Sequence, residues 1–189
     1  MIGLAGRFGV AALAGYGIGA RLEYMIAPVA FGIGSGLTTL VGVAAGAGAW
    51  QRAVRAAWTG GLIAFAGIGL IGWLVALFPE AWSRLFTSDD QVAAASMSYI
   101  RHVAPFYCLF GLGISLNFAS QGAGRMSAPL MASFARMISA TVAGWIVVEK
   151  TNLGLDGLFG AITLGIVVYG CWVAASLLVR PWREKSNGR

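Results

Sequence analysis

The chain has 189 residues, of which 58% are hydrophobic and 11% are charged, and its mean hydropathy is +0.78. Soluble domains carry about 25% charged residues, and a chain this apolar cannot cover a water-exposed surface with polar groups, which excludes an ordinary cytosolic enzyme, a disordered tail and a nucleic-acid-binding domain. The composition predicts an integral membrane protein, and the net charge of +6 then indicates basic cytoplasmic loops rather than a nucleic-acid partner.

Five apolar stretches are long enough to cross a lipid bilayer as helices, which takes about 20 residues. Four are uncharged runs of 23 to 28 residues, and the fifth contains Arg136, whose long side chain must reach one interface if the stretch is to span. The runs lack the alternation of barrel strands. We predict an all-α transmembrane lobe over residues 1–180 with helices at about 24–48, 58–78, 98–119, 129–149 and 157–180, and a basic cytoplasmic tail at 181–189.

Prolines agree with these boundaries. Pro79 and Pro181 close the second and last helices, and Pro129 opens the fourth, where no amide hydrogen is needed. Pro28 and Pro105 lie inside predicted helices and therefore predict kinks.

Alternate connections must lie on opposite sides of the membrane, and one set carries eight Lys and Arg residues against five in the other. This excess places the first set and the C-terminus in the cytoplasm. Outside the tail, the predicted cytoplasmic-loop basic residues are Arg52, Arg55, Arg125 and Arg136. Residues 8–20, thirteen uncharged positions before Arg21, are too short to span, so we interpret them as the tail of a sixth helix and the chain as a fragment.

Glycines recur at four-residue spacing in the first full helix. The pairs are Gly32 with Gly36 and Gly42 with Gly46. Small residues let helix backbones approach closely in lipid. We predict that these four glycines pack against other helices, either in fixed contacts or where one helix slides against another.

Two ionisable side chains near helix ends are candidate binding residues. Glu23 either binds a cation or cationic substrate, or serves as an interfacial residue whose charge is favoured near a helix start. His102, beside Arg101, either relays protons or anchors its helix at the interface.

A polar cluster marks the other end of the third span. It contains Asn117 and Gln121 together with Ser115 and Ser120. These side chains either bond across helices or line a cavity.

The sequence offers no catalytic set. It contains a single His, no G-x-S-x-G motif, and two cysteines without metal-ligand spacing. We therefore expect a protein that is not an enzyme and that holds no cofactor or metal centre.

Several segments, in order along the chain, resemble the multidrug and toxic compound extrusion (MATE) family. They are residues 11–23 (AALAGYGIGARLE), the Gly-rich residues 41–48, the basic residues 51–55, residues 119–125 with Pro129, and residues 153–159. The last two resemble the loop before the family's eleventh helix and the entry to its twelfth. The resemblance covers nearly the whole chain but only helices eight to twelve and the tail of seven.

The resemblance implies one of two six-helix lobes around a central cavity, with the N-terminal lobe missing. It also implies a bacterial inner-membrane antiporter that exports small organic, often cationic compounds against Na⁺ or H⁺ by rocking one lobe on the other. The family's coupling carboxylates find no match here, because residues 106–117 hold no Asp or Glu. Glu23 alone matches a position that is commonly polar.

Two alternatives stay open. A lipid-linked oligosaccharide flippase of the same superfamily would need a basic cavity for its phosphates, and only Arg101 and Arg136 lie near the spans. A membrane subunit without transport activity is the other.

Overall fold

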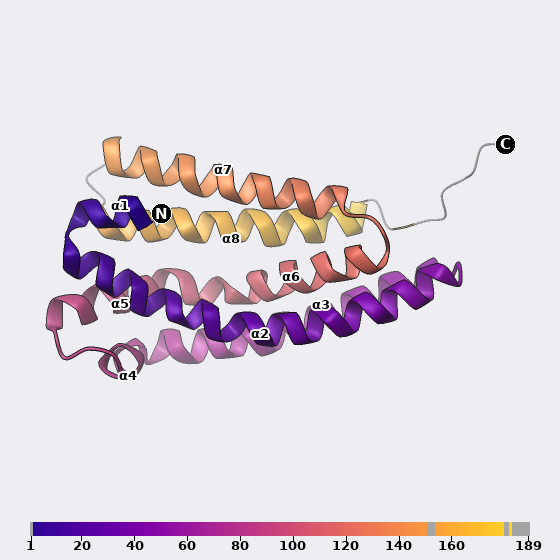
Figure 1. Ribbon diagram of the computed structural model, residues 1–189, viewed down its shortest axis with the longest axis horizontal. Helices are drawn as coiled ribbons and strands as arrows, with labels where there is room; N and C mark the ends of the chain where they lie inside the picture. The colour runs from indigo at the N-terminus through magenta and orange to yellow at the C-terminus, as the bar shows by residue number, and fades with distance from the viewer. Residues whose placement is uncertain (1, 151–153, 180–181, 183–189) are drawn as a thin grey trace.

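Five long helical segments lie side by side, each antiparallel to the one before it (Figure 1). The computed structural model describes residues 2–150, 154–179 and 182. In chain order the elements are α1 (Ile2–Ala5), η1 (Gly6–Phe8), α2 (Val10–Gly46), α3 (Trp50–Leu77), α4 (Pro79–Arg84), α5 (Asp90–Val103), η2 (Ala104–Phe106), α6 (Tyr107–Gly122), α7 (Ser127–Lys150) and α8 (Gly154–Val179). The five predicted spans are confirmed as helices long and apolar enough to cross a membrane.

The first span begins earlier than the sequence indicated. α2 starts at Val10 rather than near residue 24, because Gly9, with a φ of 102°, breaks the helix there and nothing after it does. Arg21 and Glu23 are good helix formers and continue the helix. α2 has 37 residues with Pro28 inside it, and it changes direction along its length (Figure 1), as the proline predicts.

The third span is broken into two helices. Asp89 caps α5 by accepting hydrogen bonds from the backbone amides of Gln91 at 2.8 Å and Val92 at 3.2 Å. The expected distortion at Pro105 is a 3₁₀ turn, η2, between α5 and α6. In the apolar 18-residue stretch of this span 61% of the residues are buried, against 11% in that of α7, so α5 and α6 form the centre of the bundle and α7 its periphery.

The central span separates two layers (Figure 1). α2 and α3 pack against α5 and α6 on one side, α8 packs against them on the other, and α7 packs mainly against α8. Two clusters of buried side chains fill the space between layers. One surrounds Tyr99, Tyr107 and Phe159, and the other surrounds Val41 and Leu116.

Most of the glycines that lie in close contacts between helices are not the ones that the sequence predicted. Among the described residues nothing lies within 4 Å of a Cβ built on Gly32, Gly36 or Gly46, so the structure shows no packing contact at these three. A Cβ on Gly42 would lie 3.5 Å from the carbonyl oxygen of Gly122, as predicted. Gly32, Gly36 and Gly46 lie on the opposite side of α2 from its buried residues. Four-residue spacing shows that residues share one face of a helix, but it does not show which neighbour that face contacts. The buried stripe consists of Gly15, Gly19, Leu22, Ile26, Ala30, Gly34, Leu37, Val41 and Ala44 among others.

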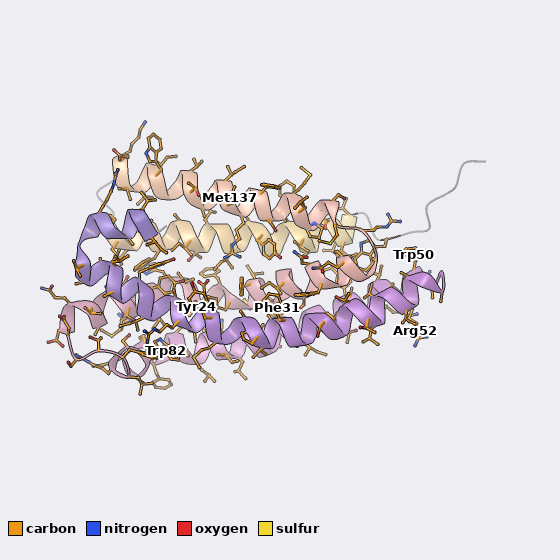
Figure 2. The ribbon with its side chains drawn as sticks, in the orientation of Figure 1. Tyr24, Phe31, Trp50, Arg52, Trp82 and Met137 are labelled. Atoms are coloured by element: carbon orange, nitrogen blue, oxygen red, sulfur yellow. The ribbon has the colours of Figure 1, made fainter. Side chains whose placement is uncertain are left out.

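Arg52, Arg55 and Arg125 gather at one end of the bundle, where Figure 2 labels Arg52 and Trp50. Arg52 and Arg55 were expected in a loop, but they occupy the first two turns of α3, because that helix begins at Trp50. Arg125 lies in the turn after α6, with its guanidinium 5.4 Å from the centre of the Trp50 ring. Of the predicted tail, 181–189, only Trp182 lies within the described residues, and the side facing the cytoplasm stays a prediction.

Two contacts hold the opposite end together. The indole Nε1 of Trp82, on α4, donates to the carbonyl oxygen of Ile18 at 3.2 Å. Arg7 of η1 forms an ion pair of 2.5 Å with Glu149 at the end of α7. The short N-terminal elements and α4 therefore fasten α2 and α7 at this end.

Candidate functional site

A cavity of about 270 Å³ lies between the two helix layers. Its walls come from α2, α5, α7 and α8, and α7 includes Met137, labelled in Figure 2. An acidic and a basic side chain, Glu23 and Arg136, line the same space. The full lining is Tyr16, Glu23, Tyr99, Ser133, Arg136, Met137, Ala140, Thr141 and Ile162.

Two tyrosine hydroxyls hold the carboxylate of Glu23. Tyr99 donates a short hydrogen bond to Glu23 Oε1, and the hydroxyl of Tyr107 lies 3.5 Å from the same oxygen. Both tyrosines are 1% exposed, so their hydroxyls are fixed by the packing of α5 and α6. Gly19, one turn before Glu23, makes room for the Tyr99 ring, since a Cβ there would lie 2.3 Å from Tyr99 Cδ1.

Aromatic rings form the base beneath this carboxylate. The rings of Tyr16 and Tyr99 meet edge to face with centroids 5.5 Å apart, and Phe159 lies 5.1 Å from Tyr99 in the same manner. Tyr16 and Tyr99 line the cavity beside Glu23, whereas Phe159 is buried behind them.

Arg136 is not the loop residue that the sequence indicated. It lies nine residues into α7, about 14 Å along the helix. Its guanidinium stands 5.3 Å from the Phe110 ring centre and 5.8 Å from that of Tyr169. Rings from α6 and α8 supply cation–π contacts that replace water around the charge, which the sequence pattern of α7 alone does not reveal.

Asn117 and Gln121 act together, as expected, but the two serines do not join them. Gln121 Nε2 donates to Asn117 Oδ1 at 3.1 Å, and Asn117 Nδ2 donates to the Tyr169 hydroxyl at 3.1 Å, so the chain of bonds links α6 to α8. Ser120 bonds back to the carbonyl of Leu116, and Ser115 is buried without a hydrogen-bond partner among the described residues. Asn117 and Gln121 therefore form a link between helices, and none of the four polar side chains lines the Glu23 cavity.

We expect Asn117→Leu to lower the free energy of unfolding by about 1 kcal/mol, because interhelical hydrogen bonds in membranes have values near that figure. Thermal unfolding in detergent, followed by circular dichroism, measures the effect. Gln121→Leu is the control, since it leaves the bond between helices in place and should change stability less. Equal losses in the two variants would contradict a role for the bond to Tyr169.

His102 lies apart from the cavity. It is exposed at the end of α5, and its Nδ1 is 2.8 Å from the carbonyl oxygen of Ser98 in the preceding turn. Ser98 also donates a short hydrogen bond to Asp156 at the start of α8. The structure therefore does not bring His102 into contact with the space between Glu23 and Arg136.

A larger hollow of about 930 Å³ opens at the other end, where α6, α7 and α8 meet. Its lining includes Met131, Trp172 and Val179. Among the described residues that line it, Arg125 is the one charged side chain and none carries a carboxylate. Among the described residues no group of three or more His, Cys, Asp or Glu side chains is placed to hold a metal ion.

The sequence marks Glu23 as a candidate, but its motifs do not point to the tyrosines that hold this side chain. Tyr16, Tyr99 and Tyr107 are spread over three helices and share no spacing motif. One signal was present, because a tyrosine inside an apolar span needs a partner for its hydroxyl. That partner is visible only when the helices are packed.

The family model MatE matches residues 1–146, and the chain belongs to this family. With five helices of spanning length, it is an integral membrane protein. The chain is 26% identical over 179 residues to the probable multidrug resistance protein NorM of Thermotoga maritima, covering 94% of this chain and 39% of the relative.

Two solved structures share the fold. A crystal structure of MATE in complex with MaL6 superposes with a TM-score of 0.81 at 20% identity, covering 94% of this chain and 42% of that one. A MOP superfamily transporter from Pyrococcus furiosus, described as having a binding pocket of reverse polarity, gives a TM-score of 0.78 at 19% identity, covering 93% and 39%. The chain therefore spans about two fifths of the proteins that it matches.

Proposed function

We propose that the chain forms one lobe of a cation-coupled exporter of small organic, chiefly cationic compounds, and that Glu23 is its cation site. The observation that carries the proposal is the carboxylate of Glu23 inside a membrane span, facing a cavity and held by two buried tyrosines. An ionisable residue within a span is costly and marks ion or substrate pathways. The MatE membership and the NorM relative support the transport class.

The complete pathway in this proposal needs a second lobe. Alternating access arises when two repeats move against each other around a site between them, and the chain spans 39% of the NorM relative. A face of α2 is available for such a partner or for lipid, since Tyr24 is 76% exposed and Phe31 53% exposed (Figure 2). We place the protein in the bacterial inner membrane with its C-terminus in the cytoplasm.

Glu23→Gln should abolish gradient-driven ethidium transport, because the amide keeps the size of the side chain but neither binds nor releases a cation. The measurement uses everted membrane vesicles from cells that express the chain together with the coding sequence preceding it in its genome. Glu80→Gln, on the exposed α4, is the matched control and should retain transport. Wild-type vesicles without gradient-dependent efflux of any cationic dye, or an unaffected Glu23→Gln variant, would contradict the proposal.

One observation favours a second candidate, a transporter of phosphate-bearing lipid-linked substrates. Arg136 lies inside the cavity rather than in a loop, so the cavity carries a positive group that can pair with a phosphate. In that case a polyprenyl phosphate, rather than ethidium, should raise the thermal unfolding midpoint of the purified protein. The carboxylate of Glu23 in the same wall disfavours an anion, and we therefore rank this candidate second.

A further inference from the structure

The cavity holds two opposite charges that do not pair directly. Among the described residues the recorded ion pairs involve Arg7 and Arg84, and none joins Arg136 to a carboxylate within 4.0 Å. Glu23 and Arg136 nevertheless line the same space of about 270 Å³. An arginine inside a span is costly unless a countercharge is near, and the cavity wall contains one carboxylate, that of Glu23.

The position of Arg136 is fixed by close packing of α7 on α8. A Cβ built on Gly165 of α8 would lie 2.9 Å from Ala140 Cβ and 3.4 Å from Arg136 Cγ, so the arginine stem sits directly over the glycine. Beyond the stem, the rings of Phe110 and Tyr169 hold the guanidinium. The positive charge is therefore a permanent part of the cavity wall, since an arginine does not lose its proton in proteins.

Two of the groups around Glu23 donate hydrogen bonds to it, and several others line the same cavity. Tyr99 and Tyr107 point their hydroxyls at the carboxylate. The cavity is also lined by Tyr16 and, from α7, by Ser133, Arg136 and Thr141. α8 contributes the apolar Ile162 to the lining. A hard metal cation takes oxygen ligands, and the wall offers hydroxyl oxygens beside one carboxylate, but it also carries the fixed positive charge of Arg136.

We propose that Arg136 determines the ion specificity of this cavity, excluding Na⁺ and leaving the proton as the ion that Glu23 exchanges. A proton needs no coordination shell, and it converts Glu23 into a neutral acid that keeps hydrogen bonds with its neighbours. Na⁺ would enter as a full charge beside the guanidinium, in a medium where like charges repel strongly. This inference rests on the proposed role of Glu23 as the coupling site.

The test is Na⁺ binding to the purified chain, measured by its thermal unfolding midpoint in NaCl against choline chloride at equal ionic strength. The relevant signal is the part of the Na⁺-dependent shift in the unfolding midpoint that is lost when the protein also carries the Glu23→Gln substitution. Wild type should show no such shift, whereas Arg136→Met should show one, with Na⁺ affinity raised roughly tenfold or more. Arg136→Lys keeps the charge and should behave as wild type. Arg101→Met removes a charge from the exposed end of α5 and serves as the matched control.

A Glu23-dependent Na⁺ shift in wild type would overturn the inference, as would its absence in Arg136→Met. If Arg136→Met fails to fold, Arg136→Gln takes its place, and the wild-type measurement still decides. Because this readout requires no transport, failure of ethidium efflux in vesicles would overturn the proposed exporter without touching the result for Na⁺. Where transport is active, a pH gradient should drive it in wild type and a Na⁺ gradient should not.

Discussion

Gly122→Ala should destabilise the lobe by about 2–3 kcal/mol, although alanine is the better helix former. A Cβ at this position would lie 2.3 Å from the carbonyl oxygen of Thr38 and 3.1 Å from the amide nitrogen of Gly42. Both are backbone atoms, so α2 and α6 must separate to admit the methyl group, and overpacking of this kind costs about 1–3 kcal/mol or more. Loss of the α2–α6 contact then exposes apolar surface along the central helix.

The matched control for Gly122→Ala is Gly36→Ala. Nothing within the described residues lies within 4 Å of a Cβ on Gly36, and replacing glycine by alanine inside a helix gains up to about 1 kcal/mol. The two variants should therefore shift the thermal unfolding midpoint of the purified chain in opposite directions. Destabilisation by both, or by neither, would contradict the packing of α2 on α6 described above.

Tyr99→Ala should cost about 3–5 kcal/mol, the range for deleting a buried aromatic side chain. The ring is 1% exposed and contacts Gly19, Tyr16 and Phe159 at the junction of α2, α5 and α8. Its removal leaves a cavity and frees the Glu23 carboxylate from its closest donor. We expect poor recovery of folded protein after detergent extraction, measured by size-exclusion chromatography, together with loss of ethidium transport in vesicles.

Phenylalanine variants separate the two roles of this tyrosine. Tyr99→Phe keeps the ring and removes only the hydroxyl, so it should stay folded and still impair transport if the bond to Glu23 positions the carboxylate. Tyr107→Phe should have a smaller effect, because its hydroxyl lies 3.5 Å from Glu23 Oε1. Equal transport in both variants and wild type would show that Tyr99 acts through packing alone.

The Tyr99 and Arg136 experiments address two sides of one cavity. Tyr99 holds the acidic group from α5, and Arg136 supplies the basic group from α7. α7 packs mainly against α8 and is the least buried span. The charge that we assign to ion specificity therefore lies on the span with the smallest buried share, which is held in place mainly by its packing on α8.

Much of the architecture was determined by the sequence alone. Long apolar runs specify helical spans, because backbone groups in a bilayer must form their hydrogen bonds within a helix. The sequence predicted all five spans that the structure contains among its described residues. Gly-rich motifs in order identified the family that the MatE match confirms. Pro105 marked the break between α5 and α6, since a proline inside a helix removes a hydrogen bond wherever the helix lies.

Tertiary structure alone decided which faces and which charges meet. Spacing placed Gly32 and Gly36 on one face of α2, but the packed face is the opposite one, because burial depends on where α5 and α6 lie. Arg136 was counted with the cytoplasmic-loop basic residues, because its side chain was expected to reach one interface from the predicted helix at 129–149. Its partners, the Phe110 and Tyr169 rings and the cavity it shares with Glu23, come from helices distant in sequence. The periodicity of one helix reveals its stripes, whereas the electrostatics of a buried charge depend on every helix around it.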